Sequence, residues 1–473
     1  MAYIQGEPRN QTSLFPVSLE DLIPEDHLVR VIDAYVAGLD LVQLGFGRAT
    51  PKGTGRPSYD PADQLKLYLY GYFQRIRSSR RLEAECQRNV EVMWLINRLK
   101  PDFKTIADFR RDNKTAFIAT CRAFVQFCRA VGLIAGDLVA IDGSKFRTVA
   151  SARRHLNLKQ LKLQEEKLDK RIAQYLVQLD EADKDEAGET VDRSAIKTAL
   201  ARLEDKQSNN RTCQALMKSM DLEQFNAHES DARMMRTAKG PRVAYNVQTA
   251  VDAEHCLILH HAVTQDGDDR RQLEPMAKEA KEQLQQPELT VTADAGYSNG
   301  QQFQACEDAN ITAYVPPSRS KNSSRKGKDF FDRKDFVYDV EHDHYQCPAG
   351  QLLTLKQLHN GNREYQAIKD CTSCALKAQC TDAPRRYVSR HANEDAFERM
   401  GQRMRAHPEM MVSRRSIVEH PFGNLKQWLF GNGRFLLRQL EGARAEMALA
   451  INAYNLKRVI NVLGARQLMA LMG

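Results

Sequence analysis

The order of strand-like and helical segments after residue 137 restricts this chain to one class of fold more strongly than any other feature. Runs rich in β-branched residues alternate there with segments whose apolar residues recur at helical spacing. Such an order predicts an α/β fold, with antiparallel strands and then alternating helices and strands forming a mixed sheet flanked by helices. Strands are expected at 137–150, 241–264 (a hairpin), 289–294 and 311–317, and helices at 271–286 and 300–310.

The remaining segments suggest a division into domains. Residues 1–135 are helical in pattern, and the core is expected in two parts, 136–315 and 394–473, the second consisting of helices. Between the two parts we expect a basic loop and a cysteine-rich insert at 316–393. A helical hairpin is predicted at 155–225, because Leu168, Ile172, Tyr175 and Leu179 follow the spacing of a coiled-coil seam.

The N-terminal helical segment admits two interpretations. Its short basic helices, one of which begins near Arg80 and Arg81, suit docking on DNA. The same periodicity also suits a dimerisation module, and the pattern alone does not separate the two. The net charge of +8 is modest for 473 residues, so it permits a polyanionic partner without requiring one.

Membrane insertion and export are not expected. No run approaches the roughly 18 apolar residues of a membrane span, and residues 1–16 lack a charged-then-apolar signal pattern. We therefore expect a cytoplasmic protein with reduced cysteines and no membrane partner.

Two aspartates lie in strand contexts. Asp142 follows Val139 and Ile141, and Asp294 ends the strand 289–294. Burying a carboxylate is costly unless a metal or another cation pairs with it. Ligand sites also gather at strand ends in α/β sheets, so both acids are candidates for a functional site.

A third acid, Glu419, lies in a helical segment. Arg415 precedes it by four residues and Lys426 follows it by seven, so all three share one face of a continuous helix. Pro421 either kinks this helix or marks its first turn. Three such carboxylates suit two divalent cations about 3.5–4 Å apart, and Mg²⁺ favours all-oxygen ligands. Arg415 and Lys426 would then bind flanking phosphates.

Each acid taken singly is more often an ordinary surface residue, so the prediction depends on their combination. Lys145 and Arg147 follow Asp142, and Asn246 and Gln248 lie on the next strand. These four residues are candidates to position DNA near the metals, although ordinary polar positions at a strand edge explain them equally well.

The combination resembles the acidic triad of RNase H-like (DDE) insertion-sequence transposases. Arg415-x3-Glu419-x6-Lys426 matches the signature around their catalytic glutamate, except that Val412 stands where a tyrosine is usual. The stretches SDARMMR, YNVQTAVD, ADAGY and PDFKTIADFR resemble the branch with a helical N-terminal domain and a cysteine-bearing insert. The resemblance runs from about residue 15 to residue 460.

This resemblance implies an RNase H-like catalytic core and a DNA transposase. Such an enzyme recognises terminal inverted repeats in double-stranded DNA, cuts at the element ends and joins the 3′ hydroxyls to target DNA. It implies Asp142, Asp294 and Glu419 as catalytic metal ligands for two Mg²⁺ ions, with Mn²⁺ as a substitute. It also implies a homo-oligomer, a dimer on paired ends, in a bacterial cytoplasm. The residues themselves lead only to two-metal phosphodiester chemistry.

Cys347, Cys371, Cys374 and Cys380 lie within 34 residues of one another. The pair Cys371-x2-Cys374 has knuckle spacing, and four thiolates would form a closed structural Zn²⁺ site in a zinc-ribbon-like insert. A reduced, metal-free cluster is the alternative, and His342 or His344 could replace one cysteine. We expect the insert to pack beside the acids.

Two other functions remain open on the sequence. One is a non-catalytic DNA-binding protein derived from a transposase, against which the intact triad argues. The other is an RNase H-like nuclease that cuts DNA without joining it.

Overall fold

The computed structural model describes residues 18–51, 53–54, 57–151, 155–184, 193–226, 228–237, 240–318, 324–325, 328–359 and 362–473. Much of the predicted basic loop, including Arg319, Lys321 and Lys326, lies outside these ranges. Among the described residues, no helix is long and apolar enough to cross a bilayer.

The N-terminal part consists of helices, and their starts follow from local sequence. Asp60 caps α2 by accepting a hydrogen bond from the Ala62 amide, and Pro61 occupies the first turn, where its missing N–H costs nothing. Asp102 caps α5 through the amides of Lys104 and Thr105. The helices are α1 (Leu28–Ala37), α2 (Pro61–Phe73), α3 (Ser79–Arg88), α4 (Val90–Leu95), α5 (Phe103–Asp112) and α6 (Lys114–Ala130).

A mixed sheet forms the centre of the molecule, as the alternation of patterns predicts. Its order is β4-β5-β1-β7-β8, and β6 also pairs with β5. β1, β4 and β6 run antiparallel to β5, whereas β7 runs parallel to β1 and to β8. The strands are β1 (Val139–Arg147), β4 (Arg233–Thr237), β5 (Gly240–Asp252), β6 (Ile258–Thr264), β7 (Leu289–Thr292) and β8 (Ile311–Tyr314).

Helices cover this sheet and join it to the N-terminal part. α9 (Leu273–Leu284) packs against β5, β6 and β1, and α13 (Glu409–Gly423) packs against β1, β5 and β7. α14 (Gln439–Leu463) is buried along most of its length and contacts α2, α6 and β6. One hydrophobic core therefore runs from the N-terminal helices into the sheet. The other helices of this region are α10 (Gly300–Asp308), α12 (Glu394–Ala406) and α15 (Ala465–Met472).

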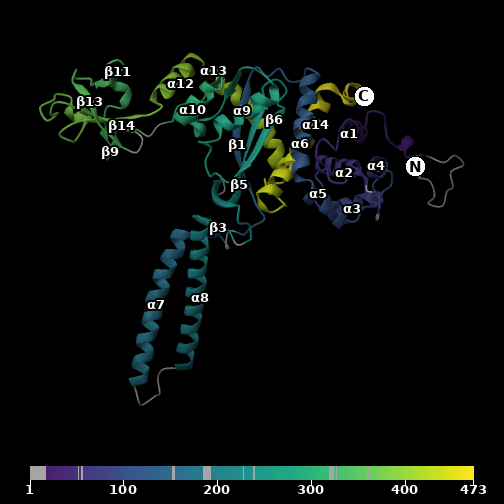
Figure 1. Cartoon of the computed structure of the whole chain (residues 1–473), viewed down its shortest axis with the longest axis horizontal. Helices are drawn as coiled ribbons and strands as arrows, with labels where there is room; N and C mark the ends of the chain where they lie inside the picture. The colour runs from purple at the N-terminus through teal and green to yellow at the C-terminus, as the bar shows by residue number, and fades with distance from the viewer. Residues whose placement is uncertain are drawn as a thin grey trace, which may run out of the picture.

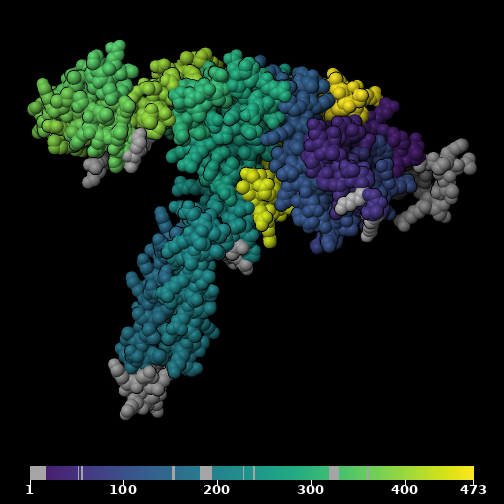
Figure 2. Space-filling view, in the orientation of Figure 1, coloured from purple at the N-terminus to yellow at the C-terminus, as the bar shows by residue number. Residues whose placement is uncertain are grey.

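A long helical hairpin projects from the sheet as an arm (Figures 1 and 2). Its helices α7 (Leu158–Lys184) and α8 (Arg193–Ser219) start from a small two-stranded sheet of β2 (His155–Asn157) and β3 (Gln224–Asn226). Leu168, Ile172, Tyr175 and Leu179 are half-buried and the residues between them are exposed, as their spacing predicts. The sequence DKDEAGE at 183–189 is typical of a turn between the two helices, and it lies mostly outside the described residues.

The cysteine-bearing insert is a separate small body with its own apolar core. The basic, Ser-rich sequence of residues 316–345 favours a loop, but β11 lies inside this segment, so the insert begins earlier than the pattern predicts. The insert does not pack on the sheet that carries the acids, since α10 and α12 lie between them (Figure 1). Its antiparallel strands, in sheet order, are β11 (Val337–Asp339), β12 (His344–Gln346), β13 (Leu352–His359), β14 (Asn362–Ala367) and β15 (Tyr387–His391).

Candidate active site

Asp142 and Asp294 lie close together, because the strands β1 and β7 that carry or precede them are neighbours in the sheet. Asp142 is in the middle of β1, and Asp294 follows β7, which pairs with β1 in parallel at Val139 and Ala140. The Asp294 carboxylate caps the short turn that follows by accepting a hydrogen bond from the Gly296 amide at 2.8 Å. The strand pairing therefore brings together two acids that are 152 positions apart in the sequence.

The guanidinium of Arg414 links the two acids. Its Nη2 lies 2.8 Å from Asp142 Oδ1 and 3.7 Å from Asp294 Oδ2. The Arg414 side chain is only 11% exposed, and its Nε finds no partner within the described part of the chain. A buried positive charge therefore lies between the two carboxylates, as electrostatics requires for acids in such a place.

The surroundings of Asp142 shift the pKa of its carboxyl. Burial raises the pKa of its carboxyl to about 6, with Arg414 opposing the rise and the charges of Asp294 and Asp269 adding to it. The Gly143 amide donates a hydrogen bond to Asp142 Oδ1 at 2.9 Å. A carboxyl in this state gains strongly from any cation that replaces solvent beside it.

Glu419 is not grouped with the two aspartates in this structure. It is exposed on α13, as is Arg415, and neither side chain has an ion pair or hydrogen bond with a described residue. Since α13 begins at Glu409, the hypothesis that Pro421 marks a first turn is wrong. Pro421 lies near the end of the helix, which continues into a wider π-helical turn at Asn424–Leu429.

Lys426 lies in that π-helical turn, close to Asp142. Its ammonium is 5.5 Å from the centre of the Phe146 ring, and burial lowers its pKa while Asp142 opposes that change. Of the three residues predicted to share one face, Lys426 therefore lies within the electrostatic influence of Asp142, whereas Arg415 and Glu419 face solvent.

Lys145 and Arg147 already have polar partners within the protein. Lys145 Nζ pairs with Asp269 Oδ1 at 3.2 Å, and Arg147 Nη2 reaches the Asn432 carbonyl. Asn246 and Gln248 are fully buried, so neither is placed to contact DNA. In the N-terminal part, Arg80 and Arg81 are exposed on α3, and Arg80 lies over the Phe103 ring at 5.2 Å.

The aspartate pair suits a divalent cation on two grounds. Its donors are oxygens, and it already accommodates one positive charge. A Cβ added to Gly296 would lie 2.9 Å from Asp294 Oδ1, so a larger residue there would displace that carboxylate. No three His, Cys, Asp or Glu side chains of the described residues lie in an arrangement that could hold a metal, so the cation would require Glu419 or another ligand to move in.

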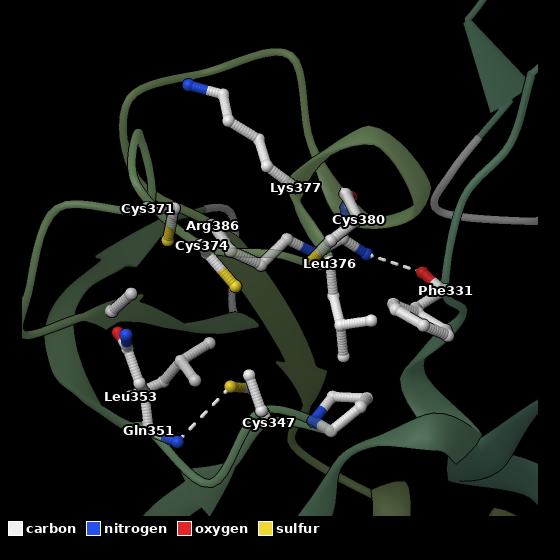
Figure 3. Close-up of a pocket in the computed structure, with 13 residues that line it drawn as sticks. Phe331, Cys347, Gln351, Leu353, Cys371, Cys374, Leu376, Lys377, Cys380 and Arg386 are labelled. Carbon is white, nitrogen blue, oxygen red and sulfur yellow. Dashed lines mark hydrogen bonds between the residues drawn. The ribbon is translucent and has the colours of Figure 1, made fainter.

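The four cysteines of the insert surround one small cavity of about 20 Å³ (Figure 3). Cys371 and Cys380 are buried, and Cys347 and Cys374 are half-buried. Cys347 opens a tight turn in which Gly350 has a positive φ and donates its amide to the Cys347 carbonyl. The Gln351 amide donates to Cys347 Sγ at 3.3 Å. His342 and His344 instead lie beside Asp339, so neither joins the cysteines.

Two family models match the chain. One, described as a transposase domain (DUF772), matches residues 17–112. The other, described as a transposase DDE domain, matches residues 211–456, which is more than half of the chain. Asp294 and Glu419 lie inside the second range, whereas Asp142 lies between the two.

The comparison with curated proteins found no match. Among solved structures, a cryo-EM structure of the piggyBac transposase synaptic complex with hairpin DNA is 9% identical to this chain. The alignment covers 96% of this chain and 78% of that one, with a TM-score of 0.30.

Proposed function

The chain belongs to the transposases with a DDE domain, and from this we propose that it binds the terminal inverted repeats of an insertion sequence, cleaves the DNA there and joins the freed 3′ hydroxyls to target DNA. The observation that carries the proposal is the meeting of Asp142 and Asp294 around one buried guanidinium. Acids gathered at strand ends with a cation between them suit chemistry on a phosphodiester. We further propose that the central sheet is an RNase H-like core.

The proposed catalytic acids are Asp142, Asp294 and Glu419, which would hold Mg²⁺ or Mn²⁺. When bound, such a metal pair lowers the pKa of the attacking water or hydroxyl and stabilises the leaving oxyanion. Lys426 would place positive charge beside Asp142, and the exposed Arg415 would bind a DNA phosphate next to Glu419.

Arg414 and Glu419 lie on different sides of α13, so they cannot both face the aspartates. At about 100° per residue, they project about 140° apart around the helix axis. In the observed conformation the helix turns Arg414 toward Asp142, which leaves Glu419 in solvent. Entry of Glu419 therefore requires Arg414 to release the aspartates, through a movement of α13 or of its π-helical end.

DNA would be held by surfaces outside the acid pair. We propose that Arg80 and Arg81 on α3 contact phosphates of the terminal repeat, since both are exposed and Arg80 is oriented by the Phe103 ring. We also propose a homodimer that holds two ends together, with dimerisation as an additional task of the N-terminal helices.

A strand-transfer assay tests the function. The purified protein is mixed with Mg²⁺, a plasmid target and labelled duplexes taken from both DNA flanks of its coding region. Joined product supports the transposase proposal. Cut but unjoined DNA would show a nuclease without strand transfer, and binding without cutting would show a non-catalytic derivative; either result would reject the proposal.

We also propose that Cys347, Cys371, Cys374 and Cys380 hold a structural Zn²⁺ ion. Support comes from four cysteines that line one cavity large enough for a single water-sized occupant. In the described conformation no three of their sulfurs lie in an arrangement that could hold a metal, so binding would require the side chains to turn toward the cavity. The metal would link β12–β13 to the turn before α11 (Lys377–Cys380), a region that otherwise has a small apolar core.

Purified protein is expected to contain about one zinc per chain by elemental analysis. Cys371→Ser should lose that zinc and lower the temperature at which the insert unfolds, because structural zinc contributes its binding energy to folding. Cys213→Ser, which alters an isolated half-buried cysteine on α8, is the matched control and should keep the metal. The site would be disproved if purified wild-type protein contained no zinc and Cys371→Ser did not change the temperature at which the insert unfolds.

A further inference from the structure

Asp269 lies next to the aspartate pair, although no sequence motif points to it. It is in the loop between β6 and α9, and its side chain is 21% exposed. Three donors converge on its Oδ1: Asn246 Nδ2 at 2.6 Å, Gln248 Nε2 at 2.6 Å and Lys145 Nζ at 3.2 Å. A carboxylate with three donors, one of them charged, is held strongly in one position.

The direction of these contacts shows on which face of the sheet Asp269 lies. Side chains alternate along a strand, so Asp142 faces α13, whereas Gly143 and Lys145 face the opposite side of the sheet. On β5, Asn246 pairs with Lys145 and Gln248 pairs with Gly143 in the strand register. Asp269 therefore packs beneath the stretch of β1 that carries Asp142, from the other face of the sheet.

Asp269 also reaches the turn that carries Asp294. Gln248 donates its amide to Asp269 and accepts a hydrogen bond from the Tyr297 hydroxyl. Burial holds the Tyr297 pKa well above 10, so the hydroxyl keeps its proton. On the same turn, a Cβ added to Gly296 would lie 3.8 Å from Asp269 Oδ2.

The residues around Asp269 are closely packed. A Cβ on Gly143 would lie 2.7 Å from Asp269 Oδ1, so the strand can approach this closely only with glycine. Asn246 is fully buried, and its Oδ1 has no hydrogen-bond partner among the described residues. An unpaired buried amide oxygen costs free energy, which the Nδ2–carboxylate bond partly offsets. Such a cost is expected where an arrangement serves function.

We propose that Asp269 is a positioning residue of the catalytic centre, whose carboxylate sets the separation of the Asp142 strand from the Asp294 turn. This inference rests on the proposed function, because the separation matters for a cation shared by the two aspartates. Asp269 itself faces the other side of the sheet from Asp142, so it acts through Lys145, Asn246 and Gln248.

The test is the binding of Mn²⁺ to the DNA-free protein, measured by calorimetry, together with cleavage as a function of Mg²⁺ concentration. Asp269→Ala should weaken Mn²⁺ binding about 10- to 100-fold, as loss of an outer-shell partner typically does. It should raise the Mg²⁺ concentration for half-maximal cleavage similarly. Asp269→Asn should lower the affinity for Mn²⁺ only about fivefold, because the amide oxygen of the asparagine still accepts hydrogen bonds from Asn246 and Gln248 but carries no charge.

Asp268→Asn is the matched control, since Asp268 is an exposed acid on the same loop whose side chain, within the described part of the chain, accepts only the Arg270 amide. It should bind Mn²⁺ like the wild type. If Asp269→Ala does not fold, the fivefold loss in Asp269→Asn decides the question. Unchanged Mn²⁺ binding in Asp269→Asn, or an equal loss in Asp268→Asn, would overturn the proposal. Failure of the proposed function looks different, because the wild type itself would then yield no joined product in the strand-transfer assay.

Discussion

Replacing Asp142 by asparagine is expected to reduce metal-dependent DNA cleavage by about a thousandfold or more. The change removes the charge that would hold a cation at β1, and the loss of several kcal/mol of transition-state stabilisation corresponds to a rate effect of this size. Glu419→Gln should cause a comparable loss although Glu419 has no partner in the described structure, because its carboxylate is needed only once α13 releases Arg414. Gel-based cleavage of end-containing duplex measures both effects.

Asp142→Asn also has a predictable effect on the stability of the protein. Burial raises the Asp142 pKa to about 6 from an unfolded value near 4. A raised carboxyl pKa favours the folded state at low pH, and this advantage is lost as the pH rises through 6. The stability of Asp142→Asn relative to wild type should therefore increase from pH 5 to pH 8, since asparagine carries no such penalty.

Two observations would contradict the assignment of Asp142. One is cleavage by Asp142→Asn at a rate close to that of the wild type. The other is an equal loss in Asp137→Asn, which neutralises an exposed acid just before β1 and is expected to leave cleavage unchanged. Gel-shift binding of end DNA should remain intact in all of these variants, because the acids repel phosphates and do not bind them.

Replacing Arg77 by alanine is expected to lower the free energy of unfolding by about 3–5 kcal/mol, the usual effect of leaving one partner of a buried ion pair alone. Arg77 Nη1 lies 2.9 Å from Glu446 Oε1, and the two side chains are 13% and 0% exposed. Arg77 also donates to the carbonyls of Phe430 and Arg434, and Glu446 accepts from the Leu436 and Leu437 amides.

This network joins three parts of the molecule. Arg77 lies between α2 and α3, Glu446 lies on α14, and residues 430–437 connect the π-helical turn of Lys426 to α14. The same connection meets the end of β1, where Arg147 exchanges backbone hydrogen bonds with Gly433 and Phe435. The N-terminal helices are therefore tied to the strand that carries Asp142.

The loss in Arg77→Ala should depend on pH in a defined direction. Burial raises the Glu446 pKa, and Arg77 opposes the rise, so removing Arg77 raises it further. A carboxyl with a raised pKa contributes stability that is lost as the pH rises. The free energy of unfolding of Arg77→Ala, relative to wild type, should therefore be lower at pH 8 than at pH 5. Urea unfolding at both pH values measures this difference.

Arg111→Ala serves as the control for this prediction. Arg111 forms ion pairs with Asp108 and Asp112, but its side chain is 62% exposed, so its loss should change the free energy of unfolding very little. The role assigned to Arg77 is refuted if its alanine variant unfolds at the same urea concentration as Arg111→Ala at both pH values.

The sequence identifies the local elements of this fold and two of its central acids. The alternation of residues 137–150 and 289–294 predicts β1 and β7, and the position of Asp294 at a strand end predicts its place at the sheet edge. The coiled-coil spacing predicts the α7–α8 arm. These features depend on neighbours a few positions away, because helix and strand periodicity is set by the backbone.

The site's partners are decided by tertiary structure alone. The spacing of residues in the helix favours Arg415, yet it is Arg414, 272 positions from Asp142, that faces this acid, because the rotation of α13 is set only by its packing on the sheet. Asp269 escapes notice in a loop rich in aspartates, although its place between a strand and a helix is where ligand-site acids gather. Arg77 and Glu446 are 369 positions apart, and nothing local distinguishes them from surface charges. Periodicity reports which side of an element is buried, whereas the pairing of charges depends on how distant elements close on one another.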